Sequence, residues 1–105
     1  MSNQNQSFKL IEIEELKDIS LNNDITYIDV RDEQSFNDSH IPDAKNINQT
    51  NIKQFLSATE IDRHLVIYCY HGNSSRNAAQ YFISQGFKNI YSLEGGFEAY
   101  KASVE

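Results

Sequence analysis

The chain has 105 residues, of which 39% are hydrophobic and 23% are charged, and its formal net charge is -6. This length and composition are typical of one globular domain with its own hydrophobic core. The negative charge disfavours nucleic acid and anionic membranes as partners, and no apolar run approaches membrane-spanning length. Residues 1–7 lack the pattern of a signal peptide, and the single cysteine cannot form an internal disulfide, so we expect a reducing, cytoplasmic location.

Apolar periodicity divides the chain into alternating strands and helices that follow a flexible tail at residues 1–7. Such alternation predicts one α/β domain over residues 8–105, with a central parallel sheet of about five strands and helices on both faces. In chain order we expect a strand at 8–11, a helix at 12–21, a strand at 25–30, a short helix at 32–37, a short strand around Ile47, a helix at 49–57, a strand at 65–68, a helix at 77–85 ended by Gly86, a strand at 89–93 and a helix at 97–103.

The segment with the clearest chemical signal joins the apolar strand at 65–68 to the helix at 77–85 and begins with the only cysteine, Cys69. Ligands bind at the carboxyl ends of strands in open α/β sheets, and helix N-termini attract anions and lower thiol pKa values. A buried structural thiol is the alternative, because isolated cysteines are often of that kind. The loop residues suited to a nest of backbone N–H groups around an anion are Tyr70, His71, Gly72, Asn73, Ser74 and Ser75.

The side chains around Cys69 each allow a structural and a functional interpretation. Tyr70 and His71 are expected at the mouth of the site, where they orient substrate rather than transfer protons. Ser74 and Ser75 are suited to capping the following helix, and one of their hydroxyls is suited to donating to the cysteine sulfur. Arg76 is either a solvated helix residue or a charge that steers anions towards the loop.

A second group of polar residues follows the strand at 25–30. We expect Asp29 to form a structural ion pair or to anchor the loop, and Arg31 could face the pocket as part of a second shell. His40 is expected to make hydrogen bonds within its own loop. The histidines and Cys69 have no spacing typical of metal ligands, so we predict no metal site.

A cysteine phosphatase is the main alternative chemistry. That chemistry requires an arginine at the position that Ser75 occupies here, and Arg76 stands one place too late. We also expect the loop to be too tight for a tetrahedral oxyanion centred over the thiolate. The sequence therefore disfavours phosphatase and arsenate reductase activities.

Four groups of residues, in chain order, carry a family likeness: Asp29-Val30-Arg31-Asp32 with Gln34-Ser35-Phe36, His40-Ile41-Pro42 with Ala44, Cys69 to Ser75 with Ala78-Ala79-Gln80-Tyr81, and Gly95-Gly96-Phe97-Glu98-Ala99. On these residues the chain resembles the rhodanese family, in particular its single-domain thiosulfate sulfurtransferases, over about residues 8–101. Many rhodaneses have Gly where this chain has Ser39 and Asp43, and a family aromatic residue, often Trp, is Tyr100 here.

The resemblance implies that the Cys69 thiolate takes the sulfane sulfur of thiosulfate as a persulfide and releases sulfite. Loop amides stabilise the terminal sulfur, and a nucleophilic acceptor then removes it, either cyanide or a thiol such as that of thioredoxin. No metal or organic cofactor is implied, and a small domain with a polar surface is expected to be a monomer. A non-catalytic persulfide carrier or interaction module remains the alternative, because few positive charges lie near the loop.

Overall fold

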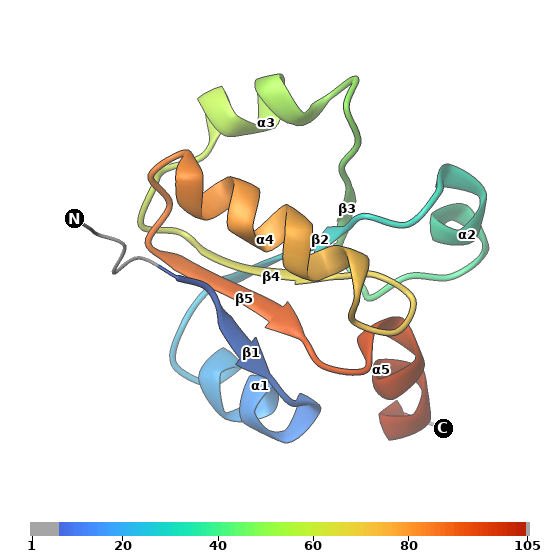
Figure 1. The fold of residues 1–105 in the computed structure, drawn as a ribbon. Coiled ribbons are helices and arrows are strands. Elements are labelled where there is room, and N and C mark those ends of the chain that lie inside the picture. Colours follow the sequence, from blue (N-terminus) through green and yellow to red (C-terminus); the bar gives the residue numbers. More distant parts are fainter. Residues whose placement is uncertain (1–6, 105) are drawn as a thin grey trace.

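The computed structural model describes residues 7–104 and confirms the α/β class (Figure 1). Of the predicted flexible tail, residues 1–6 lie outside the described part, and Ser7 is exposed without regular secondary structure. The elements are, in chain order, β1 (Lys9–Ile11), α1 (Ile13–Ser20), β2 (Ile25–Asp29), α2 (Glu33–Asp38), β3 (Lys45–Asn46), α3 (Ile52–Ala58), β4 (His64–Tyr68), α4 (Ser74–Ser84), β5 (Asn89–Leu93) and α5 (Gly96–Val104).

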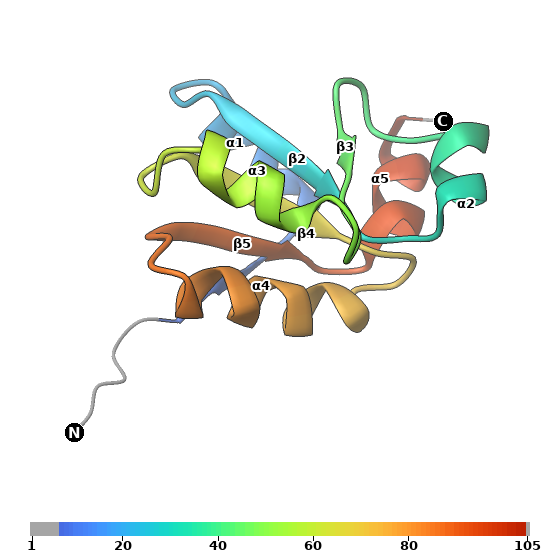
Figure 2. The same ribbon diagram turned by 90° about the horizontal axis from the view of Figure 1, so that it is seen from above.

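The five strands form one parallel sheet in the order β1-β5-β4-β2-β3, with β4 at its centre. Ile67 of β4 lies opposite Ile28 of β2 on one side and Ser92 of β5 on the other. Because all strands run in the same direction, their carboxyl ends meet at one edge of the sheet, where α2 and α5 also lie (Figure 2). This is the edge at which open α/β sheets bind ligands, and Cys69 follows β4 there.

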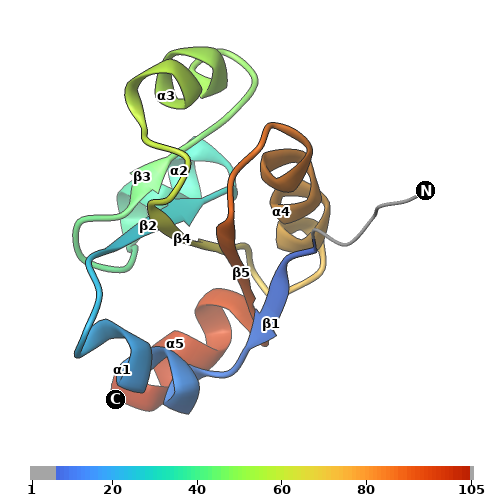
Figure 3. The same cartoon turned by 90° about the vertical axis from the view of Figure 1, so that its left-hand side faces the viewer.

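Helices cover both faces of the sheet, α3 and α4 on one side and α1 and α5 on the other (Figure 3). The side chains of β4 alternate between the two cores, because successive residues of a strand point to opposite faces. Leu65 and Ile67 belong to the core on the α3 and α4 side, whereas Val66 and Tyr68 belong to the other. Within the described residues, no helix is long and apolar enough to cross a membrane.

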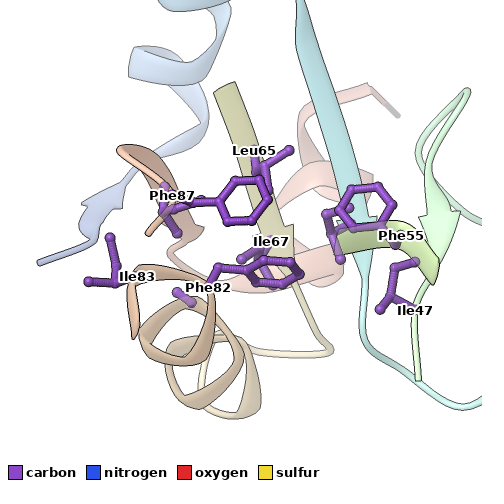
Figure 4. Packing of buried hydrophobic residues seen from close by; sticks show 10 residues of the cluster. Ile47, Phe55, Leu65, Ile67, Phe82, Ile83 and Phe87 are labelled. Carbon is purple, nitrogen blue, oxygen red and sulfur yellow. The ribbon is translucent and has the colours of Figure 1, made fainter. Parts of the chain in front are cut away.

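Aromatic side chains fill the core beneath α3 and α4 (Figure 4). Phe82 of α4 is fully buried and makes edge-to-face contacts with Phe55 and Phe87, with ring centroids 6.0 Å and 5.6 Å apart. This is a favourable geometry for aromatic pairs. Phe82 therefore fixes α4, and with it the start of α4, against the sheet.

The structure corrects the predicted start of α4, which begins at Ser74 and not at residue 77. The apolar stripe of this helix starts only at Ala78, so periodicity does not reveal its first turn. The backbone of Asn73 is already helical, and its carbonyl oxygen accepts a hydrogen bond from the N–H of Arg76 at 3.2 Å. The additional turn brings the N-terminus of α4 directly to the cysteine loop.

Asp43 explains one departure from the family pattern. Its φ angle is 69°, in the left-handed region that glycine enters without a steric penalty. Aspartate is among the few other residues that adopt this conformation routinely. The turn after Pro42 therefore accommodates a side chain at a backbone conformation that favours glycine.

Truncation of Phe82 tests its place at the centre of the core. Phe82→Ala should lower the free energy of unfolding by about 3–5 kcal/mol, because it removes a buried aromatic ring and leaves a cavity. Gln80→Ala, on the exposed side of the same helix, should change it by no more than about 0.5 kcal/mol. Chemical denaturation of both variants measures the difference. Equal effects would show that the packing of Phe82 is not a main source of stability.

Candidate active site

Cys69 stands at the carboxyl end of the central strand and is almost fully enclosed. It continues the alternation of Leu65 and Ile67 along β4, and only 4% of its surface is exposed. Tyr70 and His71, which follow it, are both exposed. The exposed part of the loop therefore begins directly after the enclosed sulfur.

Hydrogen-bond donors from the loop converge on the sulfur of Cys69. The N–H groups of Gly72 and Ser75 donate to Sγ at 3.2 Å and 3.3 Å, and the Ser75 hydroxyl lies 3.5 Å from it. The loop curls this tightly because Gly72 has a φ angle of +99°. A Cβ atom at Gly72 would also lie 3.1 Å from the backbone nitrogen of Gly95. The loop therefore forms a nest of donors around one sulfur atom.

These donors determine the acidity of the thiol. Burial raises the pKa of Cys69, but hydrogen bonds from the Ser75 hydroxyl and from the amides of Ser75, Gly72 and His71 outweigh it. The pKa is therefore lowered from its ordinary value, because these bonds stabilise the charged form. A thiolate is the nucleophilic form of cysteine, so the loop favours the reactive state.

The start of α5 fixes the loop from the other side. The N–H of Phe97 donates to the carbonyl oxygen of Cys69 at 2.8 Å, and the N–H of Glu98 donates to that of Tyr70 at 3.2 Å. Gly96 permits this approach, because a Cβ atom there would lie 2.5 Å from the carbonyl oxygen of Cys69. Donors at a helix N-terminus that lack intrahelical partners thus bind the first two residues of the loop.

Tyr70 joins the loop to α2. Its hydroxyl donates to the carboxylate of Asp32, which precedes α2, and lies 2.9 Å from the hydroxyl of Ser35. The hydrogen bond from Tyr70 is the main cause that lowers the pKa of Asp32 to about 2, with Ser35 contributing further. Tyr70 is therefore held by its backbone to α5 and by its side chain to α2.

Asp29 and Arg31 form the structural ion pair that the sequence favoured for Asp29. The Arg31 Nη2 atom lies 2.8 Å from the Asp29 carboxylate, both side chains are buried, and Arg31 also donates to the carbonyl oxygen of Ser39 at 2.6 Å. The guanidinium lies 4.2 Å from the ring centre of Phe97 and 5.7 Å from that of Tyr70. Arg31 thus packs against both the loop, at Tyr70, and the start of α5, at Phe97.

The remaining loop residues are placed as follows. Asn73 occupies the N-cap position of α4, Ser74 begins the helix at the surface, and neither Ser74 nor Ser75 caps it as expected. The exposed side chain of Arg76 is paired with Glu94 at 3.0 Å. No group of three or more His, Cys, Asp or Glu residues within residues 7–104 is arranged to hold a metal ion.

A cavity of about 460 Å³ lies beside the loop, between α4 and the segment that leads into α3. Its lining includes Val30, Ile47, Ile52, Ala78 and Phe82 but not Cys69. The cavity is therefore separate from the thiol site.

Two residues of this site, Gly96 and Ser92, were not predicted to belong to it, although Gly96 is part of the Gly95-Gly96-Phe97 motif. The Ser92 hydroxyl lies 2.8 Å from that of Ser75, and both serines are buried. Ser92 stands two residues after the core residue Ile90 in a strand, so its polar side chain on an inward face was a signal that could have been noticed. The contact between Gly96 and Cys69 joins residues far apart in sequence, and pattern alone does not reveal it.

This fold and its cysteine loop define a rhodanese: the chain belongs to that family, whose model, described as Rhodanese-like domain, matches residues 12–103. Similar curated proteins include the thiosulfate sulfurtransferase GlpE of Shewanella oneidensis, 45% identical over 94 residues that cover 90% of this chain and 93% of that protein. GlpE of Pseudomonas aeruginosa is 48% identical over 75 residues, covering 71% and 68% of the two chains. A solved rhodanese-like domain protein from Staphylococcus aureus is 28% identical with a TM-score of 0.76, covering 89% and 91%.

The lowered pKa of Cys69 predicts reactivity below the usual titration range of a thiol. The rate of alkylation by iodoacetamide, measured against pH, should reach half its maximum below about pH 8.5, the midpoint of an unperturbed cysteine. The same chain unfolded in denaturant should show the unperturbed midpoint. A midpoint in the folded protein at or above that of the unfolded chain would contradict the proposed stabilisation of the thiolate.

Two glycine substitutions distinguish the effect of disturbing the contact between α5 and the loop from the effect of backbone strain alone. Gly86→Ala introduces strain alone, of about 1–2 kcal/mol, because its φ angle is +97° and nothing lies within 4 Å of the added Cβ atom. Gly96→Ala adds a clash with the backbone of Cys69 and Tyr70, and the displaced loop should reduce alkylation at neutral pH by about tenfold or more. Gly86→Ala should alkylate as wild type does. If both variants alkylate as wild type does, the contact does not position the loop.

Proposed function

We propose that this protein is a thiosulfate sulfurtransferase that acts through a persulfide on Cys69. The proposal depends above all on the set of donors that converge on Sγ, because they stabilise a negative charge on sulfur at this position. The name of the GlpE relatives, thiosulfate sulfurtransferase, supports thiosulfate as the molecule that supplies the sulfur.

In the first half of the reaction, the Cys69 thiolate attacks the outer sulfur of thiosulfate. A bond forms between Sγ and that sulfur, the S–S bond of thiosulfate breaks, and sulfite leaves with its electron pair. The negative charge then lies on the terminal sulfur of the persulfide. The loop amides from Tyr70 to Ser75 then stabilise this charge as an oxyanion hole does. In the resting protein, those of Gly72 and Ser75 donate to Sγ, the atom next to the terminal sulfur.

In the second half, a nucleophilic acceptor attacks the terminal sulfur. The bond between Sγ and that sulfur breaks, and its electron pair returns to Cys69 as thiolate. Cyanide becomes thiocyanate, and a thiol becomes a persulfide. The covalent intermediate divides the transfer into two steps with ping-pong kinetics. Our proposal includes a protein thiol such as that of thioredoxin as acceptor, a monomeric protein and a cytoplasmic location.

The arginines near the loop bear on the choice between this enzyme and its alternatives. Arg31 is bound to buried Asp29, and Arg76 is paired with Glu94. A phosphatase requires an arginine that grips the phosphoryl oxygens, whereas Ser75 is buried with its hydroxyl directed at sulfur. The same pairing of both arginines supports the second candidate, a carrier that receives sulfur from a protein persulfide in place of the thiosulfate dianion.

Substitution of Cys69 tests the proposal directly. Wild-type protein incubated with thiosulfate and cyanide should form thiocyanate with turnover, and Cys69→Ala should form none, because it lacks the sulfur that receives the transferred atom. Ser74→Ala, at the exposed start of α4, serves as a matched loop control and should retain activity within a few-fold. Colorimetric measurement of thiocyanate gives the rates, and equal rates in wild type and Cys69→Ala would refute the mechanism.

Mass spectrometry separates the enzyme from the carrier. After thiosulfate treatment, wild type should gain about 32 Da, the mass of one sulfur atom, and should lose it on addition of cyanide. A protein that accepts this mass only from a persulfide donor, with no thiosulfate turnover, would be a carrier. Hydrolysis of an aryl phosphate by wild type but not by Cys69→Ala would instead support the phosphatase.

A further inference from the structure

We propose that Ser92 is a positioning residue for the reactive thiol and acts on Cys69 through the hydroxyl of Ser75. The inference rests on the proposed function, because it gives Ser92 a part in preparing the thiolate that attacks the sulfur donor. It extends the site from the cysteine loop to the strand beside it.

Three side-chain atoms form a continuous series of polar contacts. Sγ of Cys69 lies 3.5 Å from Oγ of Ser75, which lies 2.8 Å from Oγ of Ser92. Cys69 directly follows β4, Ser75 lies in the first turn of α4, and Ser92 is the second-last residue of β5. Ser92 is paired with Ile67, two residues before the cysteine, so β5 places its side chain directly beside the strand that leads to the thiol.

Both serines are buried where the surrounding side chains are apolar. Ser75 is 0% exposed and Ser92 is 1% exposed. Ser92 lies on the same face of β5 as Ile90, which belongs to the core beneath α4. A hydroxyl in such a layer costs free energy unless it is hydrogen-bonded, and here each hydroxyl is the partner of the other. This placement points to a role for the hydroxyls themselves.

The hydroxyl pair can satisfy both charge states of the cysteine. In the thiol, Sγ–H donates to Ser75 Oγ, and the Ser75 hydroxyl donates to Ser92. When the thiol loses its proton to solvent, the Ser75 hydroxyl rotates to donate to the thiolate and the Ser92 hydroxyl donates to Ser75. No proton passes between the serines, because only the two O–H bonds rotate. The hydrogen bond from Ser92 polarises the Ser75 hydroxyl and so strengthens the hydrogen bond from Ser75 to the thiolate.

Charged side chains do not substitute for this pair. Within residues 7–104, no hydrogen bond joins a charged side chain to the hydroxyl of Ser75 or Ser92, and the sheet neighbours of Ser92 are the apolar residues Leu10 and Ile67. Arg76, next to Ser75, is bound to Glu94 at the surface. The other titratable side chains within two residues of Cys69, Ser75 or Ser92 in the sequence are Tyr68, Tyr70, His71 and Tyr91.

The pH dependence of Cys69 alkylation by iodoacetamide tests the proposal without using sulfur transfer. Ser75→Ala should slow alkylation at neutral pH by about tenfold or more, because it removes a hydrogen bond to a charged group. Ser92→Ala should slow it by about threefold and move the midpoint of the profile to higher pH. In the double variant, the loss should equal that of Ser75→Ala, because Ser92 acts only through that hydroxyl.

A second pair of variants covers the case in which Ser92→Ala does not fold. Ser92→Thr and Ser92→Val have nearly the same shape, and only threonine has a hydroxyl. Ser92→Thr should alkylate about threefold faster than Ser92→Val at neutral pH. Circular dichroism establishes that the compared variants are folded.

The proposal fails if Ser92→Ala has the wild-type profile, if its effect persists unchanged in the Ser75→Ala background, or if the threonine and valine variants react alike. A wild-type protein without thiocyanate formation would overturn the proposed function. If the alkylation profile nevertheless moved in Ser92→Ala, the positioning role would stand. The two failures are therefore distinguishable.

Discussion

Two peptide N–H groups at the start of α5 bind the carbonyl oxygens of Cys69 and Tyr70, and the geometry of the site depends on this contact. It fixes the direction in which the chain leaves β4, so that the next residues curl back over the sulfur. Gly96 allows the helix to approach closely enough, and the Arg31 guanidinium stacks on Phe97 from behind. The last helix of the chain thereby shapes a loop that begins nearly thirty residues earlier.

The site stabilises negative charge in a protein whose net charge is -6. It does so with dipoles: the amides of Gly72 and Ser75, a buried hydroxyl and the N-terminus of α4. Such dipoles stabilise a negative charge without a positively charged side chain, and their positions are fixed before substrate binds.

Sequence periodicity was sufficient for the type and order of the strands and helices, because each buries one face and the apolar residues repeat accordingly. It was less accurate for their bounds, since α3 begins at Ile52 and not at residue 49, and β3 is Lys45–Asn46 and not centred on Ile47. It also missed the first turn of α4, because Ser74 and Ser75 precede the apolar stripe although the chain is already helical there. The thiol was found from its place between a strand and a helix. The contributions of Gly96 and Ser92 could not be found in this way, because they depend on which strand lies next to β4 and on how closely α5 approaches.

The nest of donors around Cys69 consists mainly of backbone N–H groups, and these groups make the chemical state of the cysteine observable. The amide protons of Gly72 and Ser75 point at a single sulfur atom, so their magnetic environment depends on the charge that atom bears. The thiol is uncharged, the thiolate bears its negative charge on Sγ, and the persulfide bears it on the sulfur beyond Sγ. Two backbone resonances of an isotopically labelled protein would thus follow each stage of a turnover without a chromophore or a modified residue.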